Sequence, residues 1–269
     1  MITSYHRPQT LDEALELLAQ PDTIALGGGT LINTPQFTNS QPADFTVVDL
    51  QALGLNKIHK SGNSLEIGAT VTLQQLLESV HAPEALKQAI RQESALNIRN
   101  AATVAGTLVT CDGRSPFGTA MLAMDAGLTV DGGRWTVDRG QKTEDGLLST
   151  VYGLSDVLAL RSDLLPHKLI TKISIPLNAK IAFEMVARSP ADRPIMCVAV
   201  AHWNAGRARL ALGGWGRSPL LGMDGTEPSG IEAAARNACH DAKDEWASAE
   251  YRMDVAATLA KRCLERAQE

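Results

Sequence analysis

The spacing of apolar residues in the first two thirds of the chain changes repeatedly between a helical and a strand-like period. Thr10 and Glu13 form a capping box just before one amphipathic stretch, and Thr72 and Gln75 do the same before another. A third stretch with helical spacing leads toward a polar loop. The helices predicted from these patterns are Leu11–Gln20, Leu73–Val80 and Glu84–Gln92.

Short apolar runs between these helices predict strands, because they are rich in β-branched residues and end at polar or glycine positions. The predicted strands are Phe45–Leu50, Ser64–Val71 and Leu169–Ile175. A hairpin is also expected, in which the turn Asp131–Gly133 joins Leu128–Val130 to Trp135–Asp138.

The pattern changes after Pro176, where we place a domain boundary. Three runs then read as antiparallel strands, and two amphipathic helices close the chain. The stretch Gly213–Gly230 is rich in Gly, Pro and Ser and reads as a long connector that could face partner subunits, together with the loop edge near Phe117. The strands expected are Phe183–Arg188, Ile195–Trp203 and Arg207–Leu212, and the helices are Gly230–Ala242 and Ser248–Ala267. The fold class is therefore α+β.

Two segments rich in small residues stand out as candidates for chemistry. Gly27–Gly29 directly follow a short apolar run and precede Thr30, and Thr103–Pro116 combines glycines with hydroxyl residues before an apolar helix. Small side chains let backbone N–H groups approach a ligand, and a helix N-terminus favours an anion. Neither segment matches G-x-G-x-x-G or a Walker A loop.

Two such segments about seventy residues apart suggest a long ligand whose pyrophosphate is clamped between them. On this reading the backbone N–H groups of Gly28 and Gly106 face the phosphates and leave no room for a side chain. The alternative from these residues alone is an ordinary loop that leads into a core helix.

Composition excludes several other classes of function. The 269 residues are 44% hydrophobic and 20% charged, which fits two ordinary soluble domains, and the net charge of −5 argues against a nucleic-acid surface. No apolar run approaches the length of a membrane span and no secretory leader is apparent, so a cytoplasmic location is expected. The four cysteines are scattered without C-x-x-C spacing, so no zinc or iron-sulfur site is expected and a packing role is favoured for all four; the alternative for Cys111, which lies in the second small-residue segment, is partial accessibility.

Six blocks of the sequence, in order, resemble the FAD-binding medium subunit of the molybdenum hydroxylases, the xanthine dehydrogenase, carbon monoxide dehydrogenase and aldehyde oxidoreductase type. The resemblance covers nearly the whole chain. The blocks are YHRPQTLDEALELL (Tyr5–Leu18), GGGT (Gly27–Thr30), IRNAATVAGTL (Ile98–Leu108), LLPHKLITKISIP (Leu164–Pro176), ALGGWGRSP (Ala211–Pro219) and SAEYRMDVAATLAKRCLERA (Ser248–Ala267).

The resemblance implies a two-part FAD-binding domain of the vanillyl-alcohol-oxidase-like type over residues 1–176, with subdomains of about 1–55 and 56–176, followed by a C-terminal domain of the carbon monoxide dehydrogenase flavoprotein type over 177–269. It implies FAD as the cofactor, held by both small-residue segments, with two further positions near the ring ends. The cofactor-binding residues implied are Leu26, Gly27, Gly28, Gly29, Thr30, Leu31, Ile32, Thr103, Ala105, Gly106, Thr107, Thr110, Ser115, Pro116, Ile170 and Asp192.

The implied function is electron transfer inside a complex. FAD would take electrons from iron-sulfur clusters on a small subunit, which receives them from a molybdopterin large subunit, with two copies of each partner. Four positions depart from the family pattern, at Leu31, Ala105, Thr107 and Pro116, and a basic residue expected near Glu184 is absent. These departures leave open a second reading, a flavin-poor structural or assembly subunit of the same kind of complex.

Overall fold

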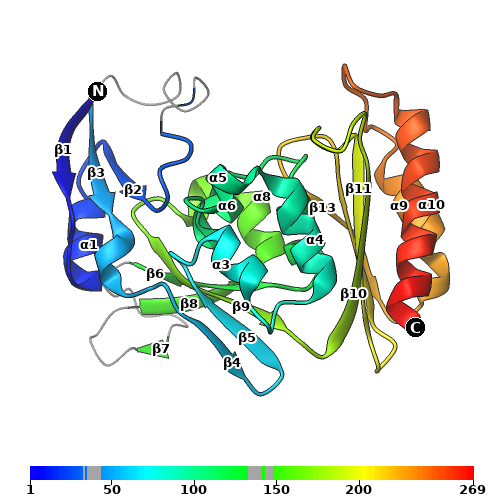
Figure 1. The fold of residues 1–269 in the computed structure, drawn as a ribbon, viewed down its shortest axis with the longest axis horizontal. Coiled ribbons are helices and arrows are strands. Elements are labelled where there is room, and N and C mark those ends of the chain that lie inside the picture. Colours follow the sequence, from blue (N-terminus) through cyan, green and yellow to red (C-terminus); the bar gives the residue numbers. More distant parts are fainter. Residues whose placement is uncertain (33, 35–43, 133–140, 143–147) are drawn as a thin grey trace.

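The computed structural model describes residues 1–32, 34, 44–132, 141–142 and 148–269, which form three sheets (Figure 1). The first sheet is small and parallel, with strand order β1-β3-β2. The helix α1 connects β1 to β2. Its elements are β1 (Ile2–His6), α1 (Leu11–Leu18), β2 (Thr23–Leu26), β3 (Phe45–Asp49) and the 3-10 helix η1 (Leu50–Leu53).

The second sheet is antiparallel, in the order β4-β5-β9-β6-β8-β7, and lies beneath a group of short helices in the middle of the molecule (Figure 1). The strands are β4 (Ile58–Ser61), β5 (Ser64–Gly68), β6 (Gly127–Asp131), β7 (Gln141–Lys142), β8 (Leu148–Gly153) and β9 (Leu169–Pro176). The helices are α3 (Leu73–Glu78), α4 (Glu84–Glu93), α5 (Leu96–Arg99), α6 (Val104–Thr110), α7 (Pro116–Ala123) and α8 (Leu154–Leu164).

The third sheet is an antiparallel meander, β10-β11-β12-β13, and carries two helices on its outer face (Figure 1). The elements are β10 (Ala179–Val186), β11 (Met196–Trp203), β12 (Ala208–Gly213), β13 (Leu220–Gly225), the 3-10 helix η2 (Pro228–Gly230), α9 (Ile231–Ala238) and α10 (Ala249–Gln268). This mixed architecture confirms the α+β class and the antiparallel C-terminal part.

The largest hydrophobic core of the described residues runs across the position near Pro176 where the sequence predicts a domain boundary. Every residue of α7 is buried, and this helix packs against β11 and β12 of the third sheet. Phe183 and Cys197 of that sheet therefore share one core with Leu65 and Ile67 of the second sheet. A separate core fills the space between the third sheet and the helices α9 and α10.

The local signals at helix starts are confirmed. The Thr10 hydroxyl accepts a hydrogen bond from the Glu13 N–H, and at Thr72 both halves of the capping box with Gln75 are present. Three predicted helices end two to four residues earlier than the pattern indicated, at Leu18, Glu78 and Ala238, whereas the other two, α4 and α10, end one residue later than predicted. The second strand of the predicted hairpin, Trp135–Asp138, and Gly133 of its turn lie outside the described residues.

Two predictions about loops are wrong. The connector Gly213–Gly230 contains the strand β13, because Leu221 and Met223 pack toward the sheet while the flanking prolines and glycines mask the strand signal. Phe117 is fully buried within α7, so its side chain belongs to the core and not to a surface.

The cysteines confirm a packing role. All four are free and buried, including Cys111, which is only 6% exposed. Burial raises the pKa of each thiol to about 12, so the thiolate form is absent at neutral pH.

Candidate functional site

A cleft of about 740 Å³ separates the glycine loop after β2 from the helices α5 and α6. Its size is in the range of pockets that bury a cofactor. One wall consists of Ile24–Ile32 and Thr34, and the other of Leu73, Glu93, Ser94, Ile98, Ala102, Thr103, Gly106, Thr107, Thr110, Cys111, Asp112 and Arg193. The two small-residue segments thus face each other, as the sequence predicts.

The glycine loop is held against the opposite wall at two points. A Cβ atom at Gly28 would lie 1.7 Å from the carbonyl oxygen of Ala101, and one at Gly27 would lie 2.6 Å from the Thr103 hydroxyl oxygen. Gly29 has a φ of +67°, in the left-handed region that favours glycine. The three glycines therefore permit close packing of backbone on backbone, and the side-chain position of Gly28 faces protein.

The same loop presents unused hydrogen-bond donors. The backbone N–H groups of Gly28, Gly29, Thr30 and Leu31 have no acceptor among the residues that the structure describes. Consecutive N–H groups without partners along a cleft form a site suited to an anion such as a phosphate. This arrangement fits the diphosphate of a dinucleotide cofactor.

The second small-residue segment, Thr103–Pro116, does not offer the free backbone N–H group at Gly106 that the sequence predicts. Residues 104–110 are the helix α6, and its first N–H groups are already used: Val104 donates to the Val71 carbonyl, Ala105 to the Ala69 carbonyl, and Gly106 to the Thr103 hydroxyl. The expectation that the Gly106 N–H faces a phosphate is therefore wrong. This helix forms a wall of the cleft rather than a set of donors.

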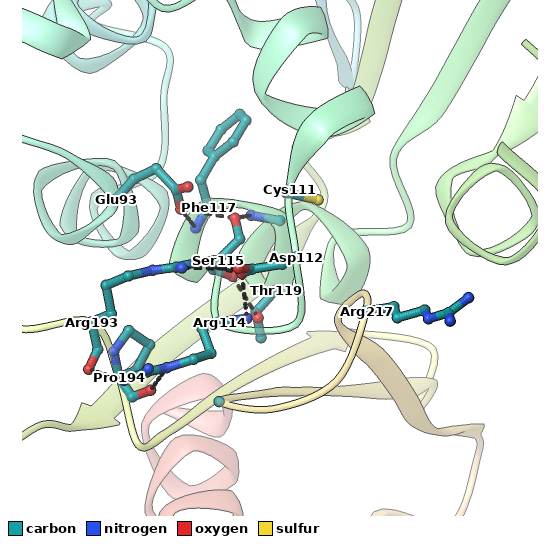
Figure 2. A network of polar contacts seen from close by, with 12 residues as sticks. Glu93, Cys111, Asp112, Arg114, Ser115, Phe117, Thr119, Arg193, Pro194 and Arg217 are labelled. Atoms are coloured by element: carbon teal, nitrogen blue, oxygen red, sulfur yellow. Dashed lines mark hydrogen bonds and ion pairs between the residues drawn. The ribbon is translucent and has the colours of Figure 1, made fainter. Parts of the chain in front are cut away.

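The start of the apolar helix α7 is also satisfied from within the chain. The Glu93 carboxylate, at the end of α4, accepts hydrogen bonds from the Ser115 hydroxyl at 2.8 Å and from the Phe117 N–H at 2.9 Å (Figure 2). Ser115 is the N-cap and Pro116 the first residue of the helix, and both are buried. The helix N-terminus that the sequence offered to a ligand anion is thus taken by an internal carboxylate.

An ion pair closes this end of the cleft. Both terminal nitrogens of the Arg193 guanidinium, Nη1 and Nη2, donate hydrogen bonds to the Asp112 carboxylate. The Arg114 guanidinium donates to the carbonyl oxygens of Arg193 and Pro194 at 3.0 Å (Figure 2). Burial raises the pKa of Asp112, but the hydrogen bonds from Arg193 and from the Arg114 N–H outweigh it and hold the pKa below its usual range. Asp112 therefore stays ionised.

Backbone pairing ties the same loop to the third sheet. The Gly214 N–H donates to the Gly113 carbonyl at 2.6 Å, and the Gly113 N–H donates to the Gly216 carbonyl at 3.1 Å. A Cβ atom at Gly113 would lie 1.6 Å from the carbonyl oxygen of Trp215. Gly113 therefore has no room for a side chain at this crossing.

The structure brings most of the predicted site residues to the cleft and leaves five away from its lining. Ala105 is buried in α6, Ser115 and Pro116 start α7, Ile170 is buried in β9, and Asp192 lies in the exposed β10–β11 loop beside Arg193. The residues on the lining are Leu26, Gly27, Gly28, Gly29, Thr30, Leu31, Ile32, Thr103, Gly106, Thr107 and Thr110.

Sequence reasoning missed Glu93 and Arg193, which reach the cleft from the end of a helix and from a distant loop. Glu93 is the last residue of the amphipathic helix α4, where an acidic side chain interacts unfavourably with the helix dipole. An acidic residue at such a position is the sequence feature that could have marked Glu93 as functional. Within the part of the chain that the structure describes, no group of three or more His, Cys, Asp or Glu residues could hold a metal ion. No described helix is long and apolar enough to cross a membrane.

The full-length relatives found by sequence are subunits of oxidoreductases. The chain is 27% identical to the 6-hydroxypseudooxynicotine dehydrogenase complex subunit alpha of Paenarthrobacter nicotinovorans, over 96% of this chain and 92% of that protein. It is 26% identical to the carbon monoxide dehydrogenase medium chain of Hydrogenophaga pseudoflava, over 97% and 95%.

The fold matches solved structures of the same kind. A chain of the reconstituted CO dehydrogenase from Oligotropha carboxidovorans superposes with a TM-score of 0.80 at 24% identity, covering 98% of this chain and 97% of that one. A chain of quinoline 2-oxidoreductase from Pseudomonas putida 86 superposes with a TM-score of 0.76 at 22% identity, covering 98% of this chain and 96% of that one. Residues 1–178 match the model of the FAD binding domain in molybdopterin dehydrogenase, and the chain therefore belongs to that family.

Proposed function

We propose that this chain is the FAD-binding electron-transfer subunit of a molybdopterin-dependent hydroxylase or dehydrogenase complex. The observation that carries the proposal is the row of partnerless N–H groups at Gly28–Leu31, on a cleft large enough for a dinucleotide. Bound FAD would supply the redox chemistry. The chain would bind the cofactor and orient it, in keeping with the resemblance and with relatives that are subunits of such complexes.

Each wall would have its own part in holding FAD. The glycine loop would donate its N–H groups to the diphosphate, and the small residues Gly106, Thr107 and Thr110 would let the extended cofactor lie along α6. The apolar residues Leu31 and Ile98 would cover flat parts of the ligand and exclude water.

A flavin-poor structural subunit is the second candidate, and one observation favours it. Among the described residues that line the cleft, the charged ones are Glu93, Asp112 and Arg193, which carry a formal charge of −1 in total when all are ionised. A diphosphate would therefore meet no surplus of positive side chains. Binding of FAD to the purified chain separates the two candidates.

We expect the purified full-length chain to bind FAD without a covalent bond. At a hundred times its dissociation constant the ligand should stabilise the fold by about 2.7 kcal/mol, a rise in melting temperature of roughly 5–10 °C for a chain of this size. Visible flavin bands that are released on denaturation, and a thermal shift with added FAD, measure this. A colourless protein with no shift would favour the structural subunit.

We also expect the chain to work in a complex with an iron-sulfur subunit and a molybdopterin subunit, two copies of each. Co-purification from the native host, with iron and molybdenum analysis of the isolated complex, tests the assignment. A lone chain that oxidises a small substrate at a good rate would contradict it. Solubility of the isolated chain would not, since its two cores can fold without partners.

A further inference from the structure

The Glu93 side chain has two different surroundings, one for each carboxylate oxygen. Its Oε2 atom accepts both hydrogen bonds at the start of α7, from Ser115 and from Phe117. Its Oε1 atom has no hydrogen-bond partner among the described residues, although the side chain forms part of the cleft wall. One oxygen is thus used in holding a helix, and the other remains available at the place where the cofactor is expected.

The charged neighbours of Glu93 are few. Asp112 and Arg193 face it across the end of the cleft, and the thiols of Cys111 and Cys197 lie near it. Asp112 and Arg193 are paired with each other, so their charges largely cancel at a distance. Both thiols are neutral at ordinary pH. An ionised Glu93 therefore gives this end of the cleft its net negative charge.

That charge would oppose an anionic ligand. Glu93 and the glycine loop line the same cleft, so a diphosphate held by the loop would be a neighbour of the carboxylate. At a separation on the order of 10 Å and an effective dielectric of about 20, one like charge weakens binding by about tenfold. Neutralising it would remove the penalty.

We propose that Glu93 is a functional residue of the cofactor cleft and takes up a proton from solvent when FAD binds. This inference rests on the proposed function of the chain. The carboxylate becomes a carboxylic acid, which keeps an oxygen to accept from α7 and gains an O–H group that can donate into the cleft. The site thereby accepts a dianionic ligand without a surplus of basic side chains, since the one arginine on its described lining, Arg193, is paired with Asp112.

The titration of the residue agrees with this role. Desolvation raises the pKa of Glu93, and the hydrogen bonds from Phe117 and Ser115 offset only part of that effect. The pKa of Asp112 moves the other way and that of Arg193 is raised, because each stabilises the charge of the other. Of the three charged groups at this end of the cleft, Glu93 is the one whose pKa is moved in the direction that favours its neutral form.

The test is proton linkage in the binding of FAD to the full-length apo chain. Isothermal titrations in buffers of different ionisation heat should show uptake of up to one proton per FAD bound. Across the pH range in which the apo chain stays folded, the dissociation constant should rise with pH. Glu93→Gln should bind FAD about tenfold more tightly than the parent at the alkaline end, with no proton uptake.

A matched control lies on the same helix. Glu84→Gln removes an exposed carboxylate that pairs with Arg91, and it should keep the proton uptake of the parent. FAD binding without proton uptake in the parent, or unchanged uptake in Glu93→Gln, would overturn the inference and leave the proposed function standing. A parent chain that binds no FAD at any pH would instead overturn the proposed function. Should Glu93→Gln fail to fold, the isothermal titrations of the parent chain in buffers of different ionisation heat still show whether FAD binding takes up a proton.

Discussion

Replacing Arg252 with methionine is expected to lower the free energy of unfolding by about 4 kcal/mol. The side chain is fully buried, and its guanidinium donates to the carbonyl oxygens of Ile195 at 3.0 Å, Ala242 at 2.7 Å and Gly214 at 3.2 Å, and to both oxygens of Asp244 at 2.8 Å. Methionine fills similar space but donates nothing. Three buried carbonyl groups and a partly buried carboxylate would lose their partner, each at a cost of about 1–3 kcal/mol before relaxation.

Urea unfolding followed by circular dichroism measures the effect. Lys261→Met on the same helix is the control. The Lys261 side chain is 57% exposed, and its one ion pair among the described residues is a surface pair in which Nζ lies 3.7 Å from Oε1 of Glu232. The control should change stability by less than about 1 kcal/mol. Equal losses in the two variants would show that the buried network of Arg252 does not stabilise the fold.

Replacing Gly28 with alanine is expected to weaken FAD binding by about a hundredfold and to cost about 2 kcal/mol of stability. The added methyl carbon would stand 1.7 Å from the Ala101 carbonyl oxygen, far inside van der Waals contact, so the glycine loop must move away from α6. Its N–H groups would then no longer line the cleft in their present positions. The loss would come from displacement of the loop, since the new side chain points toward protein.

Gly225→Ala provides the comparison, because a Cβ atom at Gly225 would have no neighbour within 4 Å and the residue lies in β13, away from the cleft. Its stability and FAD affinity should match those of the parent. Flavin fluorescence titration and thermal melting measure both quantities. Parent-like FAD affinity in Gly28→Ala would show that the loop does not hold the cofactor.

Features that depend on neighbours in the sequence were predictable. The caps at Thr10 and Thr72 are set by residues three positions away, and the central strands of the third sheet follow from short, nearly continuous apolar runs. The pairing of the two small-residue segments across one cleft was also predicted, because both lack bulky side chains that would fill the space between them.

Features that depend on distant partners were not predictable. Which N–H groups of the second segment are free depends on Val71 and Ala69, more than thirty residues earlier, and on Glu93. The packing role of Gly28 depends on a carbonyl group at Ala101. Arg252 looks like one of several charged residues in an amphipathic helix, and only the fold shows that it points inward.

The glycine crossing between residues 113 and 214–216 limits how this protein can be recombined with its relatives. The segment that matches the family model ends at residue 178, yet the loop that closes the cleft is hydrogen-bonded to a turn almost forty residues further on. A chimera joined near residue 178 would carry the cofactor loop of one parent and the supporting turn of another. Cassette exchange between homologues would therefore succeed only where the foreign sequence also places glycines at that turn.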